Sequence, residues 1–166
     1  MKRILLSQGK FAMVDDEDYE WLSKWKWTYK YVKTLSNGEE YGIAVRGKYD
    51  PKRQQNKIIR MHRKIMKLTS SNSKTVDHIN GNRLDNRRQN LRIASLLQNN
   101  KNKRSIAKSG YKSVYPVPHG KRWYAKIMVD RNRIHLGTFA TKIEAARAYN
   151  EAAQKYHGEF ACLNNI

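Results

Sequence analysis

The 166-residue sequence has little cysteine, little acid and no long apolar run. Cys162 is its only cysteine, which excludes an internal disulfide and a cysteine-rich zinc site. No stretch approaches the roughly 18 consecutive apolar residues of a spanning helix, and no signal-peptide pattern is present. We therefore expect an intracellular protein that does not cross a membrane.

The shortage of acid leaves a large positive charge. Lys plus Arg number 34 against 14 Asp plus Glu, which gives a net charge of +20 and a pI near 10.2. Such a charge repels itself in a compact monomer, so a polyanionic partner is expected. Nucleic acid is the leading candidate and an anionic membrane surface the second. Ten Tyr and four Trp provide core material, which argues against a disordered basic tail.

The N-terminal region mixes short strand patterns with one helix pattern. Acids fill the start of residues 15–27 and lysines their end, which suits a helix dipole. Tyr19, Leu22 and Trp25 recur at helical spacing, and we interpret them as core. We expect strands within 4–14 with a turn at Gln8-Gly9, a helix over 15–27, and strands over 28–34 and 40–46 joined by a hairpin at Ser36-Asn37-Gly38.

Residues 51–64 are strongly basic and contain no acid. The segment can be interpreted as a solvated face or as a phosphate-contacting surface, and the sequence does not decide between the two. The DNA-contacting alternative would use Arg60 and Arg63. A short helix is expected next, with Met61, Ile65 and Leu68 on one side, and then a loop over 69–75.

The following segment predicts a strand, a polar loop, a second strand and a helix. The strands are "TVDHI" and "LRI", the loop is "NGNRLDNRRQN", and the helix covers residues 94–103. Asp77 and His78 are adjacent on the first strand. Phosphodiester hydrolysis needs an activated water and a Lewis acid, and a histidine and a carboxylate suit these two tasks. A second oxygen ligand is still needed, and Gln98, Asn99 and Asn100 on the helix all offer one.

The segment "VDHINGNRLDNRRQNLRIASLLQNN" resembles the HNH nucleases, in the branch found in phage and intron-encoded homing endonucleases. The resemblance implies a ββα-metal unit with one Mg²⁺ or Mn²⁺ per site. It makes Asp77 a metal ligand, His78 the general base and Asn90 the loop asparagine that fixes the loop and orients the histidine. Asn99 becomes the second ligand in place of a more usual histidine, with Asn100 as the alternative.

The resemblance extends upstream to "MHRKIM", because this branch often has such a segment before the motif. His62 in that segment is interpreted as a structural residue or a phosphate contact.

Residues 111–166 form a separate block with three strand patterns, 112–117, 122–129 and 133–139, and a helix over 142–157. Alternation along the second strand puts Trp123 and Ile127 on one face and Lys126 on the other. Thr141 and Glu144 predict a capping box at the start of the helix. These patterns predict a three-stranded antiparallel sheet packed on one helix. The outer face of this sheet is basic and aromatic.

This block resembles the Apetala-two/ethylene-response-factor DNA-binding domain, through "LGTF", "EAARAY" and the final "LN". The resemblance implies that the sheet reads the major groove of DNA. Tyr115, Val117 and His119 stand where the plant proteins have two arginines and a tryptophan, so it implies nothing about the plant recognition sequence. The matching positions are Lys112, Tyr115, Val117, His119, Lys126, Arg133 and His135.

Together these patterns predict an α+β protein. Residues 1–100 would hold a mixed N-terminal region and the nuclease, with the ββα unit at about 75–103, and a basic linker at 101–110 would lead to the DNA-binding domain at 111–166. Further DNA contacts are expected at Arg87, Arg88, Lys103 and Arg104.

The expected function is a metal-dependent DNA endonuclease of homing type. It would act on double-stranded DNA as a monomer, without a small-molecule substrate, in the cytoplasm of a bacterial or phage-infected host cell. The alternative is a non-enzymatic, sequence-specific DNA-binding regulator with a degenerate nuclease unit. An RNA-binding protein is a third possibility, and the sheet lacks the aromatic run of single-strand binders.

Overall fold

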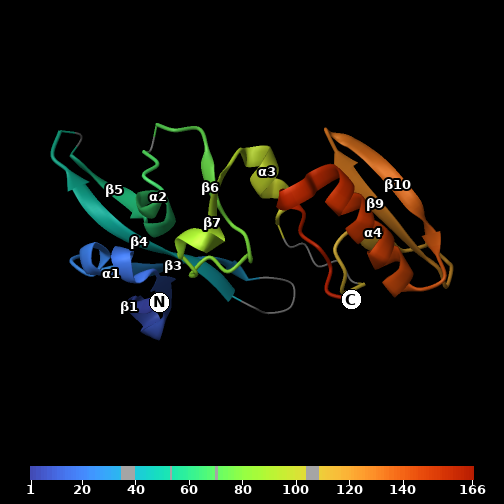
Figure 1. Cartoon of the computed structure of the whole chain (residues 1–166), viewed down its shortest axis with the longest axis horizontal. Coiled ribbons are helices and arrows are strands. Elements are labelled where there is room, and N and C mark those ends of the chain that lie inside the picture. Colours follow the sequence, from blue (N-terminus) through green and yellow to red (C-terminus); the bar gives the residue numbers. More distant parts are fainter. Residues whose placement is uncertain (35–39, 53, 70, 104–108) are drawn as a thin grey trace. The chain divides into compact units, whose positions relative to one another are not determined.

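Small antiparallel sheets and short helices alternate along the chain, as the computed structural model in Figure 1 shows. The structure describes residues 1–34, 40–52, 54–69, 71–103 and 109–166. These residues divide into two compact units, 1–96 and 97–166. The hairpin turn expected at 36–38 and residues 104–108 of the expected linker lie outside the described residues. No helix among those described has the length and apolar character that a membrane crossing requires.

A two-stranded hairpin begins the first unit. Strands β1 (Lys2–Leu5) and β2 (Phe11–Val14) pair through the 3-10 turn η1 (Ser7–Gly9). Gln8 and Gly9 have φ values of 62° and 65°, so the expected turn at these two residues is confirmed. Helix α1 (Asp16–Leu22) follows directly, with acids in its first turn.

Helix α1 is shorter than the predicted 15–27, so that prediction was wrong at its C-terminal end. It ends at Leu22 because Trp27 turns inward, where it is only 2% exposed, and its indole nitrogen donates to the Leu22 carbonyl at 2.9 Å. Trp25 lies beyond the helix, yet its ring still meets the Trp21 ring edge-on at 5.9 Å. Tertiary burial of a large aromatic therefore overrode the helical spacing.

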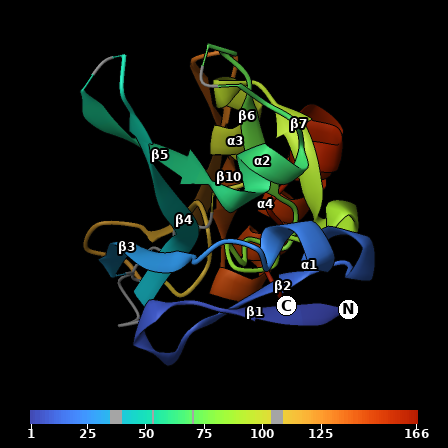
Figure 2. The ribbon, with the colours of Figure 1, turned by 90° about the vertical axis from the view of Figure 1, so that its left-hand side faces the viewer.

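Three strands form the larger sheet of the first unit, in the order β3-β4-β5. Strand β4 (Glu40–Asp50) pairs with β3 (Thr28–Thr34) along its first half and with β5 (Gln55–Arg60) along its second. The β4–β5 part extends away from the rest of the unit in Figure 2. The sequence interpretation missed β5, because its mostly exposed and polar residues carry no apolar alternation.

The segment predicted as the ββα unit, with the helix before it, closes the first unit. Helix α2 (Met61–Ile65) buries Met61 and Ile65, and β6 (Thr75–His78) pairs antiparallel with β7 (Leu91–Ala94) after the 3-10 turn η2 (Arg88–Asn90). Helix α3 (Leu96–Lys101) comes next and is shorter than the predicted 94–103, because Ala94 still pairs with β6. The shared core includes Leu22, Trp27, Met61, Ile65, Val76 and Leu91.

The second unit contains the predicted three-stranded antiparallel sheet packed on a long helix. Its strands β8 (Val114–Pro116), β9 (Trp123–Val129) and β10 (Asn132–Phe139) lie in the order β10-β9-β8. Helix α4 (Lys142–His157) covers one face, and the short turn η3 (Gly158–Phe160) follows.

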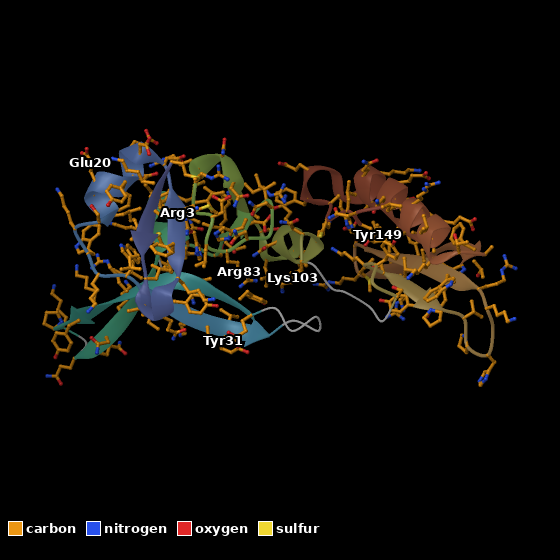
Figure 3. The ribbon with its side chains drawn as sticks, turned by 90° about the horizontal axis from the view of Figure 1, so that it is seen from below. Arg3, Glu20, Tyr31, Arg83, Lys103 and Tyr149 are labelled. Atoms are coloured by element: carbon orange, nitrogen blue, oxygen red, sulfur yellow. The ribbon has the colours of Figure 1, made fainter. Side chains whose placement is uncertain are left out.

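Local sequence signals define helix α4 closely. The capping box of Thr141 and Glu144 is present, as predicted. Tyr149, labelled in Figure 3, is 1% exposed and belongs to the core between the helix and the sheet. Alanines let the helix approach the sheet closely, and those buried are Ala145, Ala146, Ala152 and Ala153.

Candidate active site

Asp77 occupies a buried position on β6, directly opposite Arg92 of β7. The carboxylate is 4% exposed, and its Oδ2 accepts hydrogen bonds from Arg92 Nε at 2.9 Å and Nη2 at 2.7 Å. Burying an unpaired carboxylate is costly, so this charge-assisted pair stabilises the acid at its site. The site therefore accommodates a positive charge next to Asp77.

His78 ends strand β6 and is held by a buried asparagine. Its Nε2 lies 3.4 Å from Oδ1 of Asn86, whose side chain is fully buried and whose Nδ2 donates to the Leu84 carbonyl. An amide oxygen only accepts, so Nε2 is the protonated nitrogen in this pair. The neutral ring then has its lone pair on Nδ1, which makes Nδ1 the basic atom.

Burial is the main influence on the charge of His78. It lowers the pKa of the imidazole, and the nearby Arg83 lowers the pKa further. The hydrogen bond to Asn86 and the charges of Asp77 and Asp85 act in the opposite direction. The net shift is downward, so the ring is neutral near pH 7 and able to accept a proton.

The loop between β6 and β7 is held by asparagine side chains. Asn90 Oδ1 accepts from the Asn80 backbone at 2.9 Å, and its Nδ2 donates to the Asp85 carbonyl at 2.8 Å. Asn80 Nδ2 also donates to Asp85 Oδ2, and Asn82 bonds both to Asn80 and to Leu84. These contacts span the loop, so Asn90 and Asp85 together fix the path of the chain after His78.

Two loop arginines pair with carboxylates inside the first unit. Arg87 makes two 2.7 Å contacts to Asp85, which lower the pKa of that carboxyl. Arg88 makes two 2.8 Å contacts to Asp18, a residue of α1 that is 1% exposed, and also pairs with Glu17. We expected Arg87 and Arg88 to contact DNA. Their guanidinium groups instead brace the loop, and a DNA contact by either stays a prediction.

The other arginines of this unit that bear on DNA binding differ in their contacts and their exposure. Arg63 donates to the carbonyls of Thr69, Asn72 and Lys74, so it spans the loop that follows α2. Arg60 is exposed at the end of β5. Arg83 was not singled out by the sequence. Figure 3 labels it, and it lies 4.5 Å over the ring of Tyr41.

His62 lies against His78. Its ring centroid is 5.1 Å from that of His78, and the two planes meet at 81°. His62 is 8% exposed, and burial lowers its pKa to about 3. This histidine is therefore neutral, which disfavours the expected role as an ionic phosphate contact.

The expected second metal ligand belongs to the other unit. Asn99 and Asn100 lie on α3, and the boundary between the units falls at Leu96 and Leu97. The described residues contain no group of three or more His, Cys, Asp or Glu side chains that could hold a metal ion. Mg²⁺ needs only one or two carboxylates and keeps several waters, so Asp77 with amide or water oxygens fits such a hard cation.

On the second unit, aromatic rings and cations share the outer face of the sheet. The rings of Tyr115 and Tyr124 stack at 5.4 Å, and His135 continues the row at 5.9 Å from Tyr124. The ammonium of Lys126 lies 4.2 Å over the Tyr115 ring. Arg133 is exposed on the same face of β10 as His135. The alternation predicted for this face is therefore confirmed.

The remaining basic residues expected to bind DNA differ in their exposure and their contacts. His119 is exposed in the β8–β9 turn with a φ of 57°. Lys112 donates its ammonium to the Lys101 carbonyl at 2.6 Å, and burial lowers the pKa of this lysine. It is thus engaged inside the unit. Lys103 is exposed, and Arg104 lies outside the described residues.

Comparison with known proteins agrees with the geometry of the β6–β7 segment. The HNH endonuclease family model matches residues 70–101. An uncharacterized HNH endonuclease of Acanthamoeba polyphaga mimivirus is 30% identical over 165 residues, which covers 98% of this chain and 80% of the viral protein. The chain belongs to the HNH endonuclease family. The expected resemblance is confirmed, while the individual residue roles remain proposals.

The C-terminal region of this HNH endonuclease family member is similar to plant proteins. An AP2/ERF and B3 domain-containing protein of Oryza sativa subsp. japonica is 48% identical over 56 residues, or 34% of this chain and 15% of that protein. An AP2/ERF and B3 domain-containing transcription factor of Arabidopsis thaliana is 43% identical over 61 residues, or 37% of this chain and 17% of that one. The chain thus spans less than a fifth of these plant relatives, and the similarity concerns this region alone.

Sequence reasoning missed three residues that shape the site. Asn86 holds His78, Asp85 anchors the loop, and Arg92 pairs with Asp77. The "DN" of the loop was seen only as part of an ordered pattern. Arg92 was detectable in principle, since the register of a short hairpin puts it opposite Asp77.

Proposed function

We propose that this protein is a metal-dependent DNA endonuclease of homing type. The observation that carries the proposal is the buried pair of Asp77 and His78 at the end of β6, with His78 neutral and held through one nitrogen by Asn86. A neutral, oriented imidazole is suited to act as a general base, and a carboxylate next to it in the chain is suited to hold a divalent cation.

In the proposed reaction, Nδ1 of His78 accepts a proton from a water molecule, and the resulting hydroxide attacks phosphorus in line. Asn86 keeps the ring oriented during the proton transfer, and Asn90 keeps the loop in place. Asp77 would hold the divalent cation, and Asn99 would be the second ligand on the strength of its place in the sequence alone. When bound, Mg²⁺ or Mn²⁺ stabilises charge on the leaving 3′ oxygen.

The C-terminal sheet supplies affinity and register in this proposal. Its outer face offers Lys126, Arg133 and His135 together with stacked tyrosines, and a β-sheet of this size enters the major groove of DNA. Phosphate contacts position a protein on the duplex, and base contacts give specificity. The partner is double-stranded DNA, bound by a monomer that cuts one strand at a time.

The second candidate is a DNA-binding regulator without nuclease activity. The similarity of the C-terminal region to a plant protein named as a transcription factor favours it. This candidate leaves the buried Asp77–Arg92 pair and the His78–Asn86 pair without a chemical purpose, so we rank it below the nuclease.

A plasmid assay separates the two candidates. The wild type is incubated with supercoiled DNA that carries the neighbourhood of its own gene, with Mg²⁺ or with EDTA. His78→Ala is the test variant and His157→Ala, in the second unit, is the matched control. Nicking by the wild type and the control, abolished by EDTA and in His78→Ala, supports the nuclease. Intact plasmid with every protein would favour the regulator.

A further inference from the structure

Helix α2 holds His62 at a fixed place beside strand β6. Its neighbours Met61 and Ile65 are 0% and 1% exposed in the core of the first unit. The imidazole meets the His78 ring edge to face, with centroids 5.1 Å apart and planes at 81°. This distance and angle are those of a favourable contact between aromatic rings.

Packing volume alone does not account for a histidine at this position. Nδ1 of His62 is buried and has no hydrogen-bond partner among the described residues. A buried polar atom without a partner destabilises the fold relative to an apolar side chain of similar size. A leucine would fill the same space without that loss. What a flat ring adds is a directional contact with the second ring.

The contacts of His78 with Asn86 and with His62 restrain different motions of its ring. The hydrogen bond to Asn86 holds the Nε2 end at 3.4 Å. The edge-to-face contact with His62 restrains the tilt of the ring plane about that end. Burial, His78 and the cations of Arg60, Arg63 and Arg83 all lower the pKa of His62, to about 3. The residue that touches His78 is therefore uncharged and does not repel an imidazolium formed there.

We propose that His62 is a positioning residue, which holds the imidazole of His78 at the angle from which it takes a proton from water. This inference rests on the proposed nuclease function. His62 acts through His78, so its loss lowers turnover and leaves DNA affinity unchanged.

His62→Leu is the decisive variant, because it keeps the volume and removes both the flat ring and the unpaired nitrogen. We expect a melting temperature equal to or above that of the wild type, and DNA affinity within about twofold. The single-turnover cleavage rate should fall about 10- to 100-fold, the loss that a small misplacement of a reacting group causes. His62→Phe restores a ring and should regain most of the rate. His157→Leu, which replaces another histidine with an unpaired buried Nδ1, is the matched control.

An NMR measurement on the His78 ring tests the proposal without depending on DNA cleavage. The nitrogen NMR signals of His78 in the full chain should shift or broaden in His62→Leu and remain sharp in His62→Phe and His157→Leu. A wild type that fails to cut DNA would remove the nuclease proposal and leave this reading of the ring contact intact. The positioning role is overturned by wild-type cleavage in His62→Leu, by a rate loss matched by lost DNA affinity, or by unchanged His78 signals.

Discussion

The arginines beside the candidate site of the first unit and the cations on the sheet face of the second unit are used in opposite ways. In the first unit, Arg87, Arg88 and Arg92 each hold a carboxylate whose side chain is 5% exposed or less. In the second, Lys126 lies over a tyrosine ring, and Arg133 is exposed on the open face of the sheet.

The difference shows how a net charge of +20 is divided. Part of it builds the nuclease loop, because arginine pairs with carboxylates in a fixed bidentate geometry. The rest remains available for a polyanion. Net charge alone therefore does not tell a phosphate contact from an internal brace.

The largest expected effect concerns the buried carboxylate. Asp77→Asn should lower metal-dependent cleavage at least about 10³-fold, because the metal loses its charged ligand. Lys126→Ala on the sheet should cut at the wild-type rate once DNA is saturating. Calorimetric titration of the wild type and the variant with Mn²⁺ measures metal binding directly. Metal-dependent cutting that survives in Asp77→Asn would contradict the assignment.

The next effect concerns the brace between α1 and the loop. Arg88→Ala leaves the Asp18 carboxylate buried without its partner, which should destabilise the protein by about 2 kcal/mol, discounted because Arg88 is partly exposed. Arg133→Ala removes the same charge from the sheet and should cost less than about 0.5 kcal/mol. Urea unfolding of both variants measures the two values. Equal losses of unfolding free energy in the two variants would contradict the proposed difference between the units.

A pH effect of similar size involves His62. Its pKa is about 3 in the folded protein against 6.5 in the unfolded chain, so only the unfolded state takes up a proton as pH falls through this window. Between pH 7 and pH 5 the wild type should lose about 2 kcal/mol more stability than His62→Leu. Thermal unfolding at both pH values tests this difference, and parallel losses in the two proteins would speak against it.

The smallest effects concern DNA affinity. Lys126→Ala or Arg133→Ala should weaken binding several-fold across sequences and reduce the slope of log K against log salt by about 0.9, the value for one lost phosphate contact. Arg87→Ala should leave the slope unchanged, because its guanidinium is occupied by Asp85. Fluorescence anisotropy at several salt concentrations gives the slopes. A reduced slope for Arg87→Ala would return this residue to the DNA interface.

Structural features that depend on near neighbours in the chain were predicted correctly from the sequence. The capping box of Thr141 and Glu144, the turn at Gln8-Gly9 and the alternation along β9 all depend on neighbours in the chain, and the structure contains each of them. The order Asp-His followed by loop asparagines was likewise enough to identify the nuclease family, which the viral relative confirms.

Contacts between distant residues could not be predicted in the same way. Arg88 pairs with Asp18 across 70 positions, and His62 meets His78 only because α2 packs on β6. Strand β5 was missed for a related reason, since its partner β4 rather than its own pattern makes it a strand. The sequence therefore singled out Asp77, His78 and Asn90, whose roles stay predictions, and left the residues that hold them unidentified.

The most direct test of the central claim compares cutting and binding by His78→Ala on one DNA. A single-turnover assay with Mg²⁺ gives the rate of nicking, and anisotropy on the same duplex gives the affinity. The account predicts an affinity within about twofold of the wild type and a rate at least about 10³-fold lower, since removing a general base leaves the binding surfaces intact. Wild-type nicking by His78→Ala would contradict it.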